Sequence, residues 1–312
     1  EEVERMSEYD LSKVIGQVRI IARALPIQKS KVVDALKRNG HVVAMTGDGV
    51  NDALALKEAD VGIAMGIKGT DVAKQTSDII LLDDNFATII EAVREGRTVF
   101  ANIRKFVNYL LTSNFSEVFI IFAMSLPGYL ALTPAMLLRM NLLTDGLPAL
   151  ALGADPAKPG IMKMKPRSKD EGVINKRLLI LIPAIGIMGT ALMAFLFMES
   201  IGKGLAYAQT VVFTGLVFYE LVRLEVIRQQ DGTSLFSNKW LLVAISLSIL
   251  LQLAVVYTPL NAFFGTEMLT LDTWLMIGGT LIVSYVLAIL ITKAVVNFTP
   301  ETAKNIKNQP SH

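Results

Sequence analysis

The stretch Met45-Thr46-Gly47-Asp48-Gly49-Val50-Asn51-Asp52 directly follows a short apolar run, His41 to Ala44. It places two carboxylates, Asp48 and Asp52, four residues apart across a glycine-rich turn. Glycine lets the backbone bend sharply, so N–H groups of such a turn and a Mg²⁺ ion held by an aspartate can converge on one phosphoryl group. The stretch therefore predicts phosphate chemistry at the end of a strand.

Short apolar strands alternate with charged helical stretches on both sides of this turn, over residues 1–105. We expect strands over 18–25, 41–45, 61–65 and 78–82, and helices over 26–38, 51–59 and 70–77. Such alternation is typical of a parallel α/β sheet, which binds its ligands at the carboxyl ends of the strands. From Phe86 the pattern is helical and leads into an apolar segment, as expected of a stalk that couples an α/β domain to a membrane.

Residues 106–294 consist mostly of long apolar runs. Hydrophobic residues make up 52% of the chain and its mean hydropathy is +0.49, which is too apolar for a soluble domain of this length. Six segments reach the ~20 residues that cross a bilayer core: 106–126, 134–152, 178–198, 208–227, 240–258 and 273–294. We therefore expect an integral membrane protein with a six-helix all-α transmembrane bundle in a lipid bilayer.

Basic residues predict the orientation. The connection 153–177 holds seven Lys or Arg, whereas the loops at 127–133, 199–207 and 259–272 hold only Lys203. By the positive-inside rule, the N-terminal domain and the tail at 295–312 are cytoplasmic. Since this topology accounts for the basic residues, the net charge of +2 carries no further information. We expect no nucleic-acid partner. The short loops and the absence of a retention signal favour a prokaryotic plasma membrane.

Several oxygen-bearing side chains lie inside the expected spans. A carboxylate there is a functional candidate, because burying it without a partner costs several kcal/mol. The candidates are Asn114, Glu117, Asn141, Thr144, Asp145 and Glu220. Hard oxygen donors suit Ca²⁺ and disfavour softer metals. Gly146 and Pro148 weaken the helix beyond Asp145 and would free backbone carbonyls. The alternatives are interhelical hydrogen bonds for Asn114 and Thr144, and an ion pair with Arg223 for Glu220.

The amino-acid sequence of the turn and of the segments after it resembles that of the P-type ATPases. The resemblance covers nearly the whole chain, and its membrane part is most similar to the calcium pumps of the sarcoplasmic-reticulum type. It is carried by Thr46 to Asp52, Ala55-Leu56-Lys57, Gly62 to Gly66, Leu82 to Phe86, Glu95-Gly96-Arg97, Thr112-Ser113-Asn114 and Asn141 to Pro148. It implies part of a haloacid-dehalogenase-like (Rossmann-like) phosphorylation domain over 1–105, followed by the last six helices of a ten-helix pump over 106–294.

At the turn, the resemblance implies that Asp48 holds Mg²⁺ and that Asn51 and Asp52 organise the phosphorylated site. It implies that Lys29 contacts the phosphoryl group and that Thr46, Gly47 and Gly49 complete the binding loop. Taken without the resemblance, the two aspartates are a surface turn with a helix cap, and Lys29 is a solvated helix lysine. Leu54 departs from the family, which usually has proline there, so the start of the following helix is left open.

In the spans, the resemblance implies that the six polar positions contribute to two Ca²⁺ sites, with protons as counter-ions. Asn141 favours calcium over sodium, because sodium pumps usually carry aspartate there. Arg139 departs from the calcium pumps, which have an aromatic or apolar residue at this position. We expect its side chain to snorkel to the membrane surface. The alternative is that it neutralises a ligand and changes the number of ions carried.

The motif Asp-Lys-Thr-Gly, which carries the phosphorylated aspartate in this family, does not occur in the 312 residues. The actuator loop and the ATP-binding domain of the family have no counterpart either. We therefore expect the C-terminal portion of an ATP-driven calcium pump that works with the N-terminal remainder and is inactive alone, because its nucleophile lies elsewhere. Alternatives are a regulatory pump remnant, a pump for Mn²⁺ or Na⁺, and a membrane-anchored phosphatase, which would need its own Asp-x-Asp.

Overall fold

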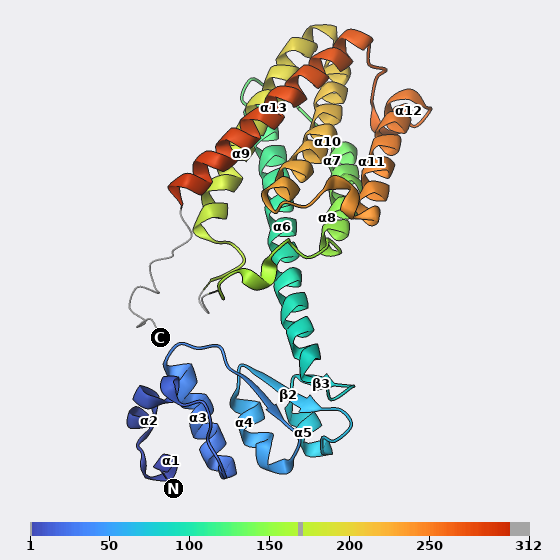
Figure 1. Ribbon diagram of the computed structural model, residues 1–312. Helices are drawn as coiled ribbons and strands as arrows, with labels where there is room; N and C mark the ends of the chain where they lie inside the picture. Colours follow the sequence, from blue (N-terminus) through green and yellow to red (C-terminus); the bar gives the residue numbers. More distant parts are fainter. Residues whose placement is uncertain (1, 168–170, 300–312) are drawn as a thin grey trace. The chain divides into compact units, whose positions relative to one another are not determined.

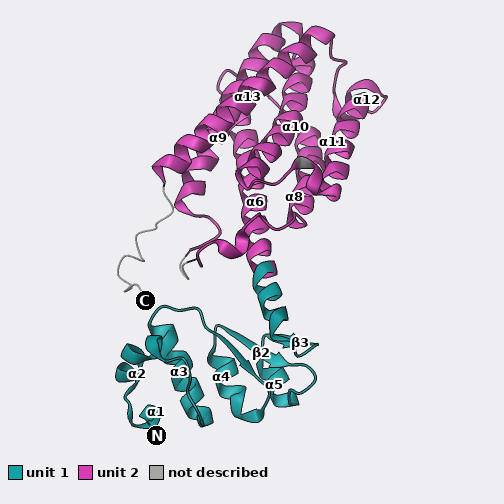
Figure 2. Cartoon of the chain, viewed as in Figure 1, with its two compact units in different colours: residues 1–94 teal, residues 95–312 magenta. Residues whose placement is uncertain are grey.

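The computed structural model describes residues 2–167 and 171–299. The chain divides into two compact units, residues 1–94 and the residues from Glu95 onward, which Figure 2 colours separately. Of the tail expected at 295–312, the first residues belong to the last helix, and residues 300–312 lie outside the described residues.

Unit 1 is built on a three-stranded parallel sheet in the order β1-β2-β3 (Figure 1). The strands are β1 (Ala44–Gly47), β2 (Val61–Met65) and β3 (Ile79–Leu81). The helices are α1 (Glu2–Arg5), α2 (Glu8–Val14), α3 (Pro26–Arg38), α4 (Ala53–Glu58) and α5 (Asp71–Thr76), with 3₁₀ turns at Ile15–Gln17 and Val50–Asp52. Since parallel neighbours need a crossover connection, α4 and α5 join the three strands, and the expected α/β alternation is confirmed.

Local signals account for several element boundaries. Helix α3 begins at Pro26, and the Gln28 side chain accepts a hydrogen bond of 3.0 Å from the N–H of Leu25 just before it. Gly40 follows the helix with φ +80°, a conformation that glycine adopts without strain. The predicted bounds of α3 and β2 are confirmed. Leu54 is accommodated, because α4 begins one residue before it.

The strand predicted over 18–25 is wrong. This segment is irregular, with Arg23 at φ 56°, and Ile20 and Leu25 are 85% and 53% exposed. A strand needs a neighbour to pair its backbone groups, and within the described residues the sheet holds only β1, β2 and β3. Strand β1 also starts later than predicted, at Ala44, since the residues at 41–43 remain outside the ladder.

Unit 2 is helical. Helix α6 (Phe86–Ser125) begins in unit 1, at the predicted residue, and continues into unit 2. The remaining helices are α7 (Pro134–Arg139), α8 (Gly146–Gly153), α9 (Lys176–Ser200), α10 (Leu205–Gln230), α11 (Lys239–Tyr257), α12 (Asn261–Phe264) and α13 (Leu271–Phe298). A π-helical turn, Met140–Asp145, joins α7 to α8. Short 3₁₀ turns lie at Ile161–Lys163, Ile201–Lys203 and Leu235–Ser237.

Five helical segments of the described chain are long and apolar enough to cross a membrane. They are Phe86–Ser125, Pro134–Gly153, Lys176–Lys203, Lys239–Tyr257 and Leu271–Phe298. Helix α10, which contains the fourth predicted span, is not among the five. Its 26 residues include Glu220, Arg223 and Arg228, all of them buried. The structure thus supports a membrane protein with several spanning helices, and the sixth span stays a prediction.

The apolar core of unit 2 centres on α10. Helices α9, α10 and α13 pack against one another, and α8 packs against α11 (Figure 1). Large side chains of α10 such as Phe213, Leu216 and Tyr219 are fully buried. A helix that is buried on all sides needs other helices around it. This explains how α10 can carry three buried charged residues, Glu220, Arg223 and Arg228.

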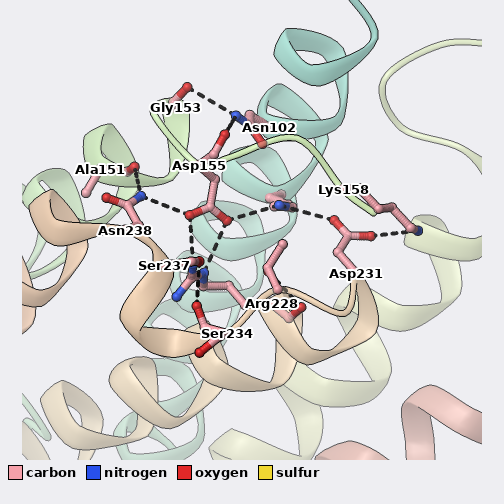
Figure 3. Close-up of polar contacts among 12 residues, drawn as sticks. Asn102, Ala151, Gly153, Asp155, Lys158, Arg228, Asp231, Ser234, Ser237 and Asn238 are labelled. Atoms are coloured by element: carbon pink, nitrogen blue, oxygen red, sulfur yellow. Dashed lines mark hydrogen bonds and ion pairs between the residues drawn. The ribbon is translucent and has the colours of Figure 1, made fainter. Parts of the chain in front are cut away.

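A buried polar network joins the middle of α6 to the ends of three other helices (Figure 3). Its centre is Asp155, just after α8, whose carboxylate accepts hydrogen bonds from Lys105 at 3.0 Å, Arg228 at 3.1 Å and Asn238 at 2.9 Å. Lys105 also lies 3.3 Å from Asp231. Buried charges are tolerated when each has partners of opposite sign. The network therefore links α6, α8, α10 and α11 through one carboxylate.

Candidate functional site

The glycine-rich turn at residues 46–52 borders a pocket of about 330 Å³ in unit 1. It lies at the carboxyl ends of the strands, as expected for a parallel sheet. Its lining consists of Lys29, Thr46, Gly47, Asp48, Asp52, Met65, Lys68, Asp84 and Phe86. The structure thus brings five of the predicted hinge residues to one pocket. Lys29 comes from α3, Thr46 and Gly47 end β1, and Asp48 and Asp52 lie on the turn that follows.

Asp52 is the buried anchor of this pocket. Its Oδ1 accepts a 2.6 Å hydrogen bond from Nζ of Lys29, and its Oδ2 accepts bonds of 3.2 Å from the N–H groups of Asp48 and Gly49. Burial alone would raise the pKa of Asp52. The Lys29 and Gly49 hydrogen bonds, the Lys29 charge and the Asp48 N–H outweigh it, and the pKa of Asp52 lies below its ordinary value. Asp52 is therefore ionised and held in place.

Gly47 is required for the close approach of the turn to Asp52. A Cβ atom built at Gly47 would lie 2.4 Å from Cβ of Asp52, closer than real side chains come. The glycine therefore lets β1 end directly against the carboxylate that holds the turn together. This is a steric reason for the Gly47 position in the predicted binding loop.

Two predicted hinge residues lie apart from the pocket lining. Gly49 contributes its N–H to Asp52, and Asn51 is exposed on the 3₁₀ turn that follows. Asp48 has an exposed side chain at the pocket, while its carbonyl accepts a 2.8 Å bond from Thr70 N–H. Because Asp48 makes no ion pair among the described contacts, its carboxylate oxygens are the ones at the pocket that could hold a cation.

Asp84 is a pocket residue that sequence reasoning did not select. Its carboxylate accepts 2.9 Å bonds from the N–H groups of Ile67 and Lys68, and these bonds, led by that of Ile67, lower the pKa of Asp84. The signal was present, since Asp83-Asp84 follows the last strand of the sheet. The structure shows Asp84 fastening the loop after β2 to the end of β3.

A second cluster lies in unit 2, among the buried helices. Glu117 of α6, Asp145 of the π-helical turn and Glu220 of α10 each offer a carboxylate oxygen within 4.8 Å of the others. All three side chains are buried, at 3%, 1% and 0% exposure. The structure thus brings together the three carboxylates that the sequence singled out, although Glu117 and Glu220 are 103 residues apart in the chain. Such a cluster requires a cation or protons to balance its charge.

Several oxygens of this cluster have no hydrogen-bond partner. They are Glu117 Oε1, both carboxylate oxygens of Asp145, both of Glu220, and Thr144 Oγ1. Buried polar atoms in folded proteins are nearly always paired, so a group of unpaired acceptors is the expected environment of a bound cation. Because these donors are all hard oxygens, the chemistry of the set fits Ca²⁺.

The π-helical turn positions part of the set. Sequence reasoning placed Asn141, Thr144 and Asp145 on one face of a helix that Gly146 weakens. The structure instead widens the helix over Met140–Asp145, a feature that is frequent at functional sites. Asn141 is exposed, and its Nδ2 donates a 3.0 Å bond to Oε2 of Glu117. Asn114 is half-buried on α6 one turn before Glu117, and its membership of the set stays a prediction.

The expectation that Arg139 snorkels to the surface is wrong. Its side chain is 5% exposed, and Nη1 donates a 2.5 Å hydrogen bond to Oε1 of Gln252. The guanidinium also lies 5.1 Å from the ring centroid of Phe213. Gln252 in turn donates to Thr214 Oγ1 at 2.9 Å. A buried amide partner on α11 replaces the water that snorkelling would have reached.

The structure also tests the ion pair considered for Glu220. Arg223, one turn later on α10, is 1% exposed, yet its Nε, Nη1 and Nη2 have no hydrogen-bond partner, and neither have the Glu220 oxygens. The described contacts therefore hold no direct Glu220–Arg223 bridge. Tyr109 of α6, whose hydroxyl is likewise buried and unpaired, was missed. The signal was its position two helical turns before Glu117, on the same face.

Comparison with known proteins identifies the family of this chain. Residues 129–295 match the family described as cation transporting ATPase, C-terminus. The chain is 46% identical over 294 residues to a calcium-transporting ATPase of Bacillus subtilis (strain 168), a match that covers 91% of this chain and 33% of that protein. It is 39% identical over 328 residues to calcium-transporting ATPase 1 of Bacillus cereus, covering 97% and 36%.

A human calcium-transporting ATPase, type 2C member 1, is 36% identical over 289 residues, covering 90% of this chain and 31% of that protein. The chain thus spans about a third of the length of the curated relatives it matches. The family match extends over more than half of the chain, and all of these relatives are calcium-transporting ATPases. The chain therefore belongs to the cation-transporting P-type ATPases and corresponds to the C-terminal part of their calcium-transporting members.

Proposed function

We propose that this chain supplies the phosphate-binding hinge and most intramembrane cation ligands of an ATP-driven Ca²⁺ pump. The observation that carries the proposal is the convergence of Glu117, Asp145 and Glu220, all buried, with five unpaired carboxylate oxygens among them. Thr144 would add a hydroxyl ligand, and Asn114 and Asn141 would add amide oxygens. Two Ca²⁺ sites built from all six positions are the arrangement suggested by the family resemblance.

The membrane arrangement is part of the proposal. Helix α10 would cross the membrane as the fourth of six spans, shielded from lipid by the helices around it. Both chain termini would then be cytoplasmic, and a prokaryotic plasma membrane is the proposed location. The N-terminal remainder of the pump would provide the phosphorylated aspartate and the ATP-binding domain. Protons would replace Ca²⁺ at the carboxylates on the return step.

In unit 1, the haloacid-dehalogenase-like fold would place the pocket next to that phosphorylated aspartate. Asp48 would hold Mg²⁺, which when bound supplies positive charge against phosphate oxygens. The hard carboxylate of Asp48 at the pocket, beside Asp84, fits this ion. Lys29 would offer its ammonium group to the phosphoryl oxygens. Asp52 would hold Lys29 and the turn in position, Asn51 would orient the phosphorylated site, and Thr46, Gly47 and Gly49 would shape the loop.

Equilibrium binding of radioactive Ca²⁺ to the purified chain in lipid nanodiscs tests the proposal. We expect binding by the wild type and a loss of at least about tenfold in affinity on Glu117→Gln, Asp145→Asn or Glu220→Gln, because each removes one charged ligand. Glu267→Gln changes an exposed carboxylate of the same unit and is the matched control. Mn²⁺ and Na⁺ added as competitors decide between cations.

Absence of Ca²⁺ binding by the wild type, with the helical circular dichroism retained, would contradict the proposal and favour a regulatory remnant. Stronger displacement by Mn²⁺ or Na⁺ than by unlabelled Ca²⁺ would assign the site to that ion instead. If all three carboxylate variants bound Ca²⁺ as tightly as the wild type does, the cation would lie elsewhere.

A further inference from the structure

Two buried arginines share unit 2 with the carboxylate cluster. Arg139 is 5% exposed at the end of α7, and Arg223 is 1% exposed on α10. The guanidinium of arginine keeps its positive charge in folded proteins. Both positive charges are therefore permanent, and something nearby has to balance them.

Arg139 is held in a fixed place near Glu220. Gln252 accepts its Nη1 hydrogen bond, and the Phe213 ring lies against the guanidinium, so the side chain has little freedom to leave. Both contacts are with neutral groups and do not neutralise the charge. Phe213 lies two helical turns before Glu220 on α10, which places the Arg139 guanidinium on the side of α10 that carries Glu220, and Nη2 of Arg139 has no hydrogen-bond partner.

Arg223 lies on the same side of α10 as Glu220, since the two are three residues apart. All three guanidinium nitrogens are unpaired. A buried guanidinium without partners is strongly unfavourable unless opposite charge is near.

The other fully buried charged residues that the structure describes in unit 2 are paired, whereas Oε2 of the half-buried Glu225 has no hydrogen-bond partner. Lys105 and Arg228 both contact Asp155 in the network of Figure 3. Glu225 is half-buried, stands two residues after Arg223 on a different side of α10, and accepts a bond from Gln229. Among the described residues, the three carboxylates are thus the fully buried anions left to balance Arg139 and Arg223.

The formal charges of this group limit how many cations it takes. When the three carboxylates are ionised to bind a cation, they and the two guanidiniums leave one net negative charge. One divalent cation changes this to one net positive charge, whereas a second would make it three positive charges in a region shielded from water. Repulsion between charges grows as the local dielectric falls. A second divalent ion would therefore meet strong repulsion.

We propose that the site binds one divalent cation, and that Arg139 and Arg223 supply the positive charge that a second ion would bring. The inference rests on the proposed function and differs from the two-site arrangement suggested by the resemblance. It assigns to both arginines a role in setting ion number and affinity. Neither touches the cation, so they act through the charge around the carboxylates.

Saturation binding of radioactive Ca²⁺ to the full chain in nanodiscs measures ions per chain directly. We expect one ion for the wild type. Arg139→Gln and Arg223→Gln each remove a positive charge and are expected to tighten binding about tenfold. The double variant, left with three net negative charges, is expected to take up a second ion. Arg139→Lys and Arg223→Lys keep the charge and are expected to bind as the wild type does.

Retention of affinity in the lysine variants separates charge from packing, because a structural role for the guanidinium would be lost in them as well. Melting temperatures of all variants verify that they are folded. Two ions per wild-type chain, or glutamine variants that bind no more tightly than the wild type, would overturn this inference and leave the proposed function standing. No binding by the wild type would overturn the proposed function and this inference with it.

Discussion

At the scale of single residues, Asp52 and Gly47 set the geometry of the hinge pocket. Asp52 accepts one bond from Lys29 and two from backbone N–H groups, and Gly47 has room only for a hydrogen. Neither contact depends on a bound ligand. The pocket is therefore preformed by the chain itself, and its shape is sensitive to single atoms.

Gly47→Ala tests this steric constraint. Its new Cβ would overlap Asp52, so the turn has to shift, and we expect a loss of about 1–3 kcal/mol in the free energy of opening of unit 1. Amide hydrogen exchange of peptides from β1 and α3 measures that free energy. Gly16→Ala is the matched control, because a Cβ there meets nothing within 4 Å. Equal protection in both variants would contradict the overlap.

The Lys29–Asp52 pair predicts a pH dependence. Since the folded-state pKa of Asp52 is lowered, the pair contributes stability that is fully present above the unfolded-state pKa of about 3.9. This stability is lost as the pH falls through the lower folded-state pKa. Lys29→Met is expected to lose about 1 kcal/mol near pH 6, an amount discounted because Lys29 is 34% exposed.

Hydrogen exchange of α3 between pH 2.5 and 7 measures this difference, with the exposed Lys57→Met as control. We expect the wild type and Lys29→Met to converge at the acidic end. A difference that persists unchanged at the lowest pH would show that Lys29 stabilises the unit by packing, without pairing to an ionised Asp52.

At the scale of elements, Asp155 joins four helices whose contacts would otherwise be separate. Asp155→Ala would leave the buried Lys105 and Arg228 without their shared partner. Breaking a buried ion pair in this way destabilises by about 3–5 kcal/mol. We expect a large fall in the melting temperature of unit 2. The fluorescence of Trp240 and Trp274 measures this temperature.

Lys158→Ala is the comparison for that prediction. Lys158 lies 3.0 Å from Asp231 and is 31% exposed, so its loss is expected to cost less than about 1 kcal/mol. If both variants melted at the same temperature, the network would not be a structural centre of the bundle.

Elements with local signals could be predicted from the sequence. Pro26 and Gly40 mark the ends of α3. The alternation of short apolar strands with charged helical stretches predicts a parallel sheet. The strand predicted over residues 18–25 was wrong, because apolar composition predicts a strand whether or not a neighbouring strand is there to pair with it. Arg139 could not be placed, since its partner Gln252 lies 113 residues later in the chain. A local reading supplies residue type and spacing, and tertiary contacts decide the rest.

The carboxylate cluster of unit 2 was also only partly predictable from the sequence. Glu117, Asp145 and Glu220 were selected because a carboxylate in an apolar span is rare, and the structure brings them together. The π-helical turn that carries Asp145 was expected only as a weakened helix, because the hydrogen-bond shift over Met140–Asp145 depends on packing. The unpaired state of Arg223 is likewise a property of the folded bundle.

At the scale of the whole molecule, the central claim is that this chain carries the cation ligands of a calcium pump. The chain covers 33% of the Bacillus subtilis relative. The most direct measurement joins this chain to the part of that relative that precedes the matched region, and follows ATP-driven Ca²⁺ uptake into proteoliposomes. The intact relative is the positive control.

We predict uptake by the joined pump and its loss on Glu220→Gln, while phosphorylation from ATP persists through the joined N-terminal part. A joined pump that is phosphorylated by ATP but carries no Ca²⁺ would contradict the claim, as would uptake that Glu220→Gln leaves unchanged.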